Sequence, residues 1–503
     1  MTRKTLNRFV RPRVVLSTLL AIGVLYFLLA VPETPPSIPP AGHSAMARPF
    51  FWNQDARWDS LEASYDVARR AGCPAIDPLL QELFRNGKAT LVRIEAVPLA
   101  AAAPEFAQLE ENTFRLAPLV GACPGRLSEY LTYAARLRDD VKRQSERWDM
   151  NDRPTRETLY RLLYGTRSAV EEAILQAPPD ERPPALLMGA DEPSATPAST
   201  LLGVTIHSGD VLVSRGGAPT SALIARGSDF PGNFSHVALA YVDSASHRLS
   251  ILESHIERGV TISTPEEYLR DAKLRVMVLR LRSDLPQLAA DPMLPHRAAT
   301  AMLRDAQSRH IPYDFSMDCN DSTSMFCSEV ASTPYRAFGI RLWMGMSHIS
   351  SAGLRSWLAG FGVRHFETQE PSDLEYDPQL RVVAEWSDPE ALRKDHTDNA
   401  VTEAMLEGAE RGNALRAPWY LLPPARIMKT FSAILNFFGG VGPVPEGMSA
   451  SSALRHEDYA ARHAAAVQKV RERTAQFRLK HSYEPPYWEM LRMAREALGE
   501  RWN

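Results

Sequence analysis

Cys327 lies in a sequence context that suits a nucleophile. It falls in "MFCSEV", after polar turn-forming residues and before a run with a helical pattern. A cysteine attacks as its thiolate, and the positive end of a helix dipole together with a neighbouring imidazole lowers the thiol pKa. Pro334 is expected to limit that helix, because a proline so far inside would kink or end it. The alternative is that Cys327 is a small buried apolar residue beside Phe326 and Val330.

Two residues on successive predicted strands could serve Cys327 as base and as orienting carboxylate. His236 begins the strand-like run "HVALAYV", in which alternation places two alanines on the face of the histidine. Glu253 is the only acid of the next run, "RLSILES", and a buried carboxylate there would need a partner such as the imidazole. Alternatively, this carboxylate lies at a sheet edge and faces water. His255 and His207 are competing bases.

The order of these motifs resembles that of a known enzyme group. "HSGDVLVSR", "FSHVALAYVD", "ILESHIERGV", "IPYDFSMD" and "MFCSEV" follow one another as in the circularly permuted papain-like branch of the NlpC peptidase superfamily. Members of this branch are cysteine amidases and related acyl hydrolases, and the resemblance covers about residues 201–385. It implies Cys327 as the nucleophile, His236 as general base and then acid, and Glu253 as the orienting residue. The backbone N–H of Cys327 is the implied oxyanion donor.

Other residues in the matching motifs receive supporting roles. Gly209 and Asp210 would belong to the strand that supports the site, and Asp314 is assigned to a turn. Cys319 lies in the polar loop "MDCND" without a predicted helix start, so it serves as a comparison thiol. No metal ion and no organic cofactor is implied.

The 503 residues are enough for two or three folding units. Residues 48–176 have the periodicity of a helical domain with four or five helices, and residues 177–200 form a linker rich in proline and acids. Residues 201–385 mix short strands with helices, so the expected class of this catalytic domain is α+β. Helices return over residues 386–503, where "RIMKTFSAILNFF" places apolar side chains on one face. That face is expected to pack in a core, with a membrane-surface helix as the alternative.

Residues 1–47 have the pattern of a transmembrane anchor followed by a proline-rich spacer. The first thirteen residues contain five basic side chains and no acid, and an uncharged run covers residues 14–31. A helix of that length rises about 27 Å, close to the ~30 Å of a bilayer core. The positive-inside rule then predicts a single-pass protein of a bacterial inner membrane with its main body in the periplasm. A cleaved signal peptide, ending near "AMA" at residues 45–47, is the alternative.

Charge and cysteine content narrow the possible partners and compartments. The net charge is -3, from 57 Lys and Arg against 60 Asp and Glu, so nucleic acid is not an expected partner. Cys73 and Cys123 could form a disulfide in an oxidising compartment or be two separate buried thiols. The helical regions could bind partner proteins.

The sequence therefore predicts a membrane-anchored, exported cysteine hydrolase of amidase or peptidase type. It would cleave an amide or related acyl bond through a thioester on Cys327, in a peptidoglycan peptide, an N-acyl compound or a lipid acyl group. Two alternatives stay open. One is a membrane-tethered scaffold or binding protein with an inactive papain-like domain, and the other is an acyltransferase that forms the same thioester.

Overall fold

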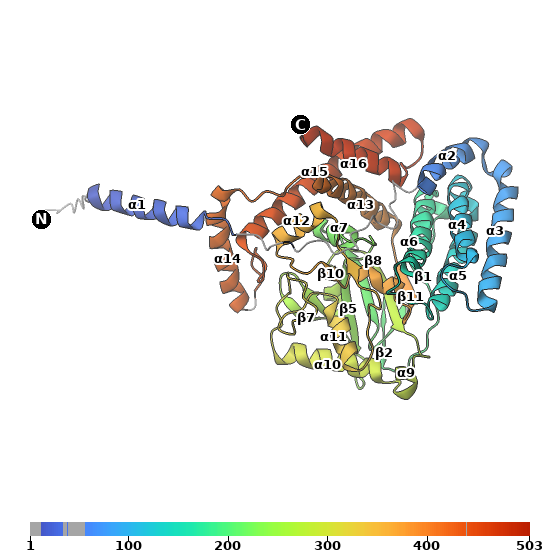
Figure 1. Ribbon diagram of the computed structural model, residues 1–503, viewed down its shortest axis with the longest axis horizontal. Helices are drawn as coiled ribbons and strands as arrows, with labels where there is room; N and C mark the ends of the chain where they lie inside the picture. Colours follow the sequence, from blue (N-terminus) through green and yellow to red (C-terminus); the bar gives the residue numbers. More distant parts are fainter. Residues whose placement is uncertain (1–11, 34–37, 39–55, 439, 503) are drawn as a thin grey trace, which may run out of the picture.

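The computed structural model describes residues 12–33, 38, 56–438 and 440–502. Figure 1 shows a central sheet with helices around it and one helix, α1 (Pro12–Leu29), that projects away from the body. The basic tip of the chain, nearly all of the proline-rich spacer and the "AMA" sequence lie outside the described residues.

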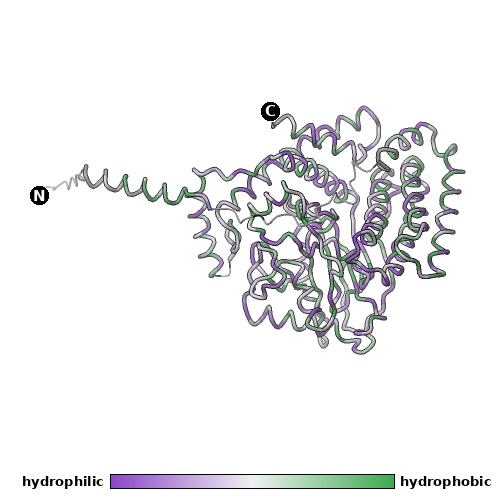
Figure 2. Tube along the Cα trace, viewed as in Figure 1, coloured by the Kyte–Doolittle hydropathy of each residue, from purple (hydrophilic) through white to green (hydrophobic). Residues whose placement is uncertain are grey.

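The N-terminal helical domain is a bundle of five helices, as the periodicity predicts. Figure 2 shows hydrophobic and hydrophilic stretches alternating along these helices, and Leu137 and Val141 of the predicted apolar stripe are fully buried. A disulfide joins Cys73 to Cys123, whose Cα atoms are 4.8 Å apart, so it ties one helix start to the end of the next helix. The helices are α2 (Ala56–Ala71), α3 (Cys73–Ala96), α4 (Pro104–Ala122), α5 (Leu127–Ser145) and α6 (Arg153–Gln176).

Seven antiparallel strands form the central sheet, in the order β1-β11-β8-β4-β5-β6-β7. This mixed architecture with helical flanks confirms the expected α+β class. Two short strand pairs, β2–β3 and β9–β10, lie outside this sheet. The strands of the sheet are β1 (Leu186–Met188), β4 (Val211–Gly216), β5 (His236–Val242), β6 (Leu249–His255), β7 (Gly259–Ser263), β8 (Lys273–Leu281) and β11 (Leu380–Trp386), and the outer pairs are β2 (Ala198–Leu201) with β3 (Val204–His207) and β9 (Ser347–His348) with β10 (Glu367–Thr368).

The two faces of the sheet carry different layers. Val237 and Leu239 of β5 share a core with helices α10 (Leu294–Ser308) and α11 (Glu329–Ala337). Ala238 and Ala240 point to the other face, which packs against the β2–β3 hairpin and Tyr268 of α8 (Pro265–Arg270). A further short helix, α9 (Pro286–Ala290), precedes α10. Period-two alternation along β5 therefore separates two apolar cores.

Helix α11 continues past Pro334 and ends at Ala337, so this proline lies inside the helix and does not itself end it. The missing N–H removes one hydrogen bond from the helix. Packing on the sheet offsets that loss, because Tyr335 is fully buried and its hydroxyl donates to the carbonyl of Gly209.

Residues 177–200 contribute strands to the fold. Leu186 pairs with Trp386, so β1 closes one edge of the central sheet.

The C-terminal helix α13 packs against α6, α7 (Pro219–Arg226), α16 and β8. Both helical regions share one apolar core. The remaining helices are α12 (Ala352–Phe361), α13 (Pro389–Glu410), α14 (Leu422–Phe437), α15 (Ala450–His481) and α16 (Tyr487–Trp502).

Two of the expectations concern apolar helices. Within residues 12–33, 38, 56–438 and 440–502, no helix combines the length and hydropathy of a membrane-crossing span, so the anchor expected over residues 14–31 gains no support. Helix α14 forms as predicted, but its apolar face does not pack in a core. Ile427, Phe431 and Ile434 are exposed, and Ser432 is buried. The core-facing prediction is wrong because the polar side of α14 contacts the body.

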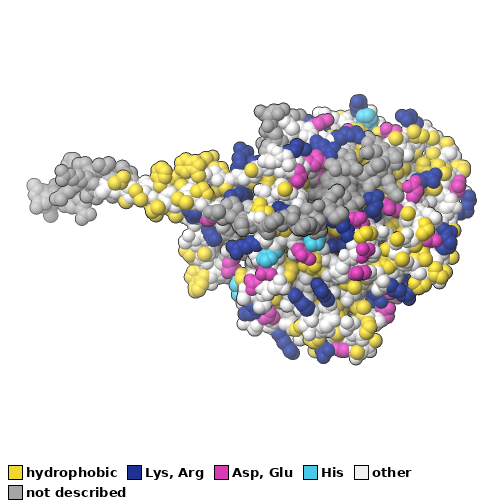
Figure 3. Space-filling view, in the orientation of Figure 1, with side chains coloured by type: hydrophobic (Ala, Val, Ile, Leu, Met, Phe, Trp, Pro, Cys, Tyr) yellow, Lys and Arg dark blue, Asp and Glu magenta, His cyan; other side chains and the backbone are white. Residues whose placement is uncertain are grey.

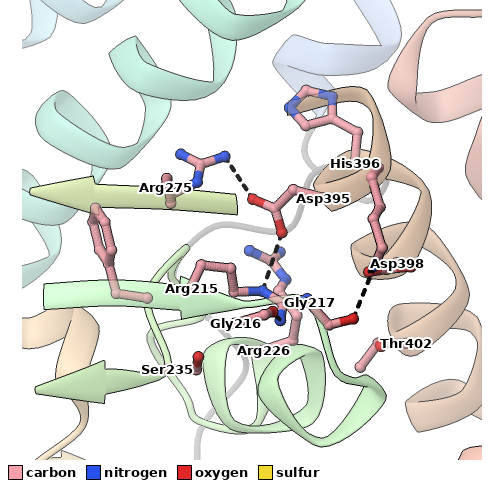
Figure 4. A network of polar contacts seen from close by, with 12 residues as sticks. Arg215, Gly216, Gly217, Arg226, Ser235, Arg275, Asp395, His396, Asp398 and Thr402 are labelled. Carbon is pink, nitrogen blue, oxygen red and sulfur yellow. Dashed lines mark hydrogen bonds and ion pairs between the residues drawn. The ribbon is translucent and has the colours of Figure 1, made fainter. Parts of the chain in front are cut away.

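A buried ionic network connects the sheet to both helical regions. Figure 4 shows Asp395 of α13 between the guanidinium groups of Arg215 and Arg275, which come from neighbouring strands. Arg215 Nε lies 3.1 Å from Oδ1 of Asp395, and Arg275 Nη2 donates to Oδ2 at 2.6 Å. Arg275 also forms an ion pair with Glu171 of α6. Nε2 of His396 lies 3.1 Å from Oε2 of the same carboxylate. Since buried charges need partners, this network fixes how the helices sit on the sheet.

Candidate active site

The structure brings His236 and Glu253 together on neighbouring strands. Nε2 of His236 lies 2.8 Å from Oε2 of Glu253, whose side chain is 1% exposed. Burial would raise the pKa of this carboxyl, but hydrogen bonds from His236 and His255 outweigh it and hold the pKa well below its usual range. An ionised carboxylate only accepts hydrogen bonds, so the proton is on Nε2 of His236. Nδ1 is therefore the basic atom of this imidazole.

Glu253 holds a second imidazole as well. Nε2 of His255 lies 3.1 Å from Oε1 of Glu253, and the rings of His236 and His255 stack with centroids 5.6 Å apart. His207 is in a different place, on the outer strand β3, where its Nδ1 contacts the carbonyl of Thr196 at 2.9 Å. Of the two competing bases, His255 is thus the one that shares the carboxylate.

Cys327 lies at the start of α11, as the sequence predicts. The next residue, Ser328, is the N-cap of this helix, which packs on β5 and β6. The loop before the helix is tied to β6, because the Ser254 hydroxyl donates to the carbonyl of Met325 at 2.7 Å. The backbone N–H of Val237 faces the thiol. Cys327 is therefore held beside the residue that follows His236 in the chain.

The thiol lies near the point where β5 and β6 separate. The paired part of these strands begins with Ala238 opposite Glu253, so Val237 and His236 lie beyond the pairing. An unpaired N–H at a strand end can turn to another acceptor, here the sulfur of Cys327. In this way the sheet brings cysteine, histidine and glutamate to one end of the β5–β6 pair.

In the resting site the thiol is protonated and the imidazole neutral. Burial raises the pKa of Cys327 to about 11, although the N–H of Val237 and the side chain of Ser328 favour the thiolate. Burial also lowers the pKa of His236, although Glu253 favours the charged ring. Among the described residues, no hydrogen bond links these two side chains. The lowered thiol pKa expected at a helix start is therefore not found in the resting site, because burial has the largest influence on the pKa of Cys327.

Gly209 and Asp210 lie at the opposite end of β4 from the site. Gly209 has φ 98°, and a Cβ there would approach Pro295 to 2.3 Å, so this position needs glycine. Asp210 forms an ion pair with Arg280 of β8 at 2.8 Å. They support the sheet rather than the reacting groups, since it is the far end of β4, at Ser214, that pairs with His236.

Cys319 lines a cavity of about 460 Å³ together with Ser332, Arg336 and Gln369. Burial raises its pKa to about 11. The Gln369 carbonyl accepts from the N-cap hydroxyl of Ser328 at 2.7 Å, so Gln369 contacts both the cavity and the start of α11. Sequence reasoning missed Gln369 because an amide in a loop gives no local signal of such a contact.

The turn before this cavity is closed by Asp314. Its carboxylate accepts from the N–H groups of Ser316 and Asp318 at 2.8 and 2.7 Å. These bonds are those of a structural turn residue, as the sequence predicts.

Comparison with known families supports the resemblance to papain-like amidases that the sequence motifs indicated. Residues 205–384 match the family described as "Permuted papain-like amidase enzyme, YaeF/YiiX, C92 family". This segment is therefore similar to circularly permuted papain-like amidases. It begins in β3, ends in β11 and contains His236, Glu253 and Cys327. No curated protein and no solved structure matches the chain. The match thus indicates a hydrolase.

Proposed function

We propose that this protein is a cysteine hydrolase that cleaves an amide or related acyl bond through a thioester on Cys327. One observation carries the proposal. The imidazole of His236 is held by a buried carboxylate, directly beside the backbone N–H that faces the thiol. An imidazole with a fixed tautomer can act as a base toward the buried thiol beside it. This arrangement suits acyl transfer.

The proposed reaction has two steps. Nδ1 of His236 takes the thiol proton as Sγ of Cys327 attacks the carbonyl carbon, and the imidazolium, held by Glu253, then protonates the leaving amine or alcohol. The acyl group stays on the sulfur as a thioester. A water molecule deprotonated by the same imidazole attacks the thioester, which releases the acid and restores the thiol. Backbone N–H groups at the start of α11, with that of Cys327 as first candidate, would bind the oxyanion.

Peptidoglycan peptides, N-acyl compounds and lipid acyl groups are the substrate classes, and we favour an amide of peptidoglycan or a small N-acyl compound. An acyltransferase would use the same thioester with another acceptor in place of water. The alternative of an inactive scaffold is less well supported. A buried carboxylate that holds an imidazole beside a thiol has no evident purpose in a degenerate site.

Trapping the acyl-enzyme tests this proposal. The full-length protein is mixed with p-nitrophenyl acetate and with an N-acyl p-nitroanilide, quenched in acid and measured by intact mass. We expect a hydroxylamine-sensitive acyl adduct that peptide mapping places on Cys327. Cys319→Ser should retain this adduct and Cys327→Ser should lose it. An adduct only on Cys319, or none with either probe, would overturn the proposal.

Membrane anchoring through residues 14–31 and export to the periplasm form a second, separate part of the proposal. Their support is the basic tip followed by the uncharged run in the sequence. Extraction of cell membranes with alkaline carbonate tests the anchor, and protease added to intact spheroplasts tests export. We expect the full chain to stay in the pellet and its body to be digested. Release into the supernatant or protection from protease would contradict the two parts respectively.

A further inference from the structure

Helix α14 carries its apolar side chains on the outside of the protein. Ile427, Phe431 and Ile434 are spaced by four and three residues, so they form one stripe along the helix. They are 63%, 48% and 53% exposed, and Phe437 at the end of the helix is 84% exposed. Leaving apolar surface in water costs about 25 cal/mol per Å². A contiguous stripe of this kind indicates a binding surface.

The opposite side of α14 is polar and faces the body. The buried hydroxyl of Ser432 accepts from the N–H of Val444 at 3.0 Å, and Asn436 accepts from the N–H of Gly442 at 3.4 Å. A Cβ on Gly442 would approach Ser432 to 2.3 Å, so the following segment packs closely on this side. The orientation of the helix is therefore fixed by its polar contacts, with the apolar stripe pointing outward.

A second exposed apolar element, α1, contacts α14. Arg426 of α14 donates to the carbonyls of Leu29 and Val31 at 2.7 and 2.8 Å. The Tyr26 hydroxyl donates to the carbonyl of Tyr420 at 2.7 Å. Figure 1 shows α14 lying across the end of α1, and Figure 3 shows hydrophobic side chains along α1 up to this junction. Leu25 and other described side chains of α1 are exposed as well.

We propose that α14 and the turn before it, η4 (Trp419–Leu421), lie in the headgroup region of a lipid bilayer. A helix with one apolar face inserts that face into the boundary between headgroups and acyl chains. Trp419 and Tyr420, both more than half exposed, are residues that concentrate at this boundary. Because α14 lies across the end of α1, α14 would lie along the surface of a bilayer into which α1 is inserted. This inference concerns lipid contact of α14; it rests on the proposed anchoring through residues 14–31 and is independent of the catalytic proposal.

Site-directed fluorescence tests this contact. Phe437→Cys is made in full-length protein that carries Cys319→Ser and Cys327→Ser, labelled with the NBD fluorophore and reconstituted into phosphatidylcholine–phosphatidylglycerol vesicles. Leu479→Cys provides the matched control, since Leu479 is 88% exposed on α15 and outside the stripe. Vesicles with brominated acyl chains are compared with unbrominated ones of the same composition.

We expect brominated lipid to quench the label at position 437 by about twofold or more and the label at position 479 hardly at all. A second variant, Ile427→Ser with Phe431→Ser and Ile434→Ser, should abolish the quenching at 437 while the far-ultraviolet circular dichroism stays unchanged. Equal quenching at both positions, or none at 437, would overturn the proposal. A blue shift of the 437 label that depends on protein concentration and not on lipid would assign the stripe to a second copy instead.

Discussion

Replacing Cys327 or His236 with alanine is expected to lower kcat/KM for the substrate that gives the acyl adduct by at least about 10³-fold. The nucleophile and its base act as one unit, so kcat/KM of the double variant should be no lower than that of the less active single variant. The physical reason is that a protonated thiol, with its pKa near 11, attacks only when Nδ1 of His236 takes the proton. Steady-state kinetics on the full-length protein measures this loss.

His255→Ala is the matched control, because His255 shares the carboxylate of Glu253 and stacks on His236. We expect a loss of less than about tenfold, since the hydrogen bond between His236 and Glu253 persists. If His255→Ala is the inactive variant and His236→Ala is active, the base has been assigned to the wrong imidazole.

The pH profile gives an independent readout of the same base. Because burial lowers the pKa of His236, the imidazole should be unprotonated at neutral pH. The acid limb of kcat/KM is then expected below the ordinary histidine pKa of about 6.5, with activity rising as pH increases through it. An acid limb above that value would contradict a neutral resting imidazole.

Asp395→Ala is expected to destabilise the fold by about 3–5 kcal/mol, because it leaves Arg215 buried without its partner carboxylate. Arg275 would keep its ion pair with Glu171, so the loss of stability comes mainly from the unpaired Arg215 on β4. Urea unfolding followed by circular dichroism measures the difference in the free energy of unfolding. The variant should also loosen the packing of α13 on the sheet.

Glu390→Ala provides the control on the same helix, since Glu390 forms an exposed ion pair with Arg393. Exposed pairs contribute about 1 kcal/mol or less, so this variant should unfold close to wild type. Similar losses for the two variants would show that burial does not determine the strength of the Asp395 network.

Local pattern alone predicted much of the amidase domain. His236 starts a strand, Glu253 lies on the next strand and Cys327 precedes a helix, as expected. These features depend on period-two alternation and turn-forming residues, which neighbouring positions in the sequence specify. The same holds for the five-helix bundle, whose apolar stripes repeat every three or four residues.

The sequence by itself thus determined the type and order of most elements, and its resemblance to permuted papain-like enzymes pointed to the three residues proposed for catalysis. Only the tertiary structure decided which groups of α13 and α14 are buried. In α13, Asp395 and Glu403 are fully buried because their arginine partners come from β4, β8 and α7, so the helix has no apolar stripe to detect. In α14 the polar side faces inward, and at Cys327 burial raises the pKa of the thiol. Each of these outcomes depends on contacts with residues distant in the chain, and no local sequence pattern reveals such contacts.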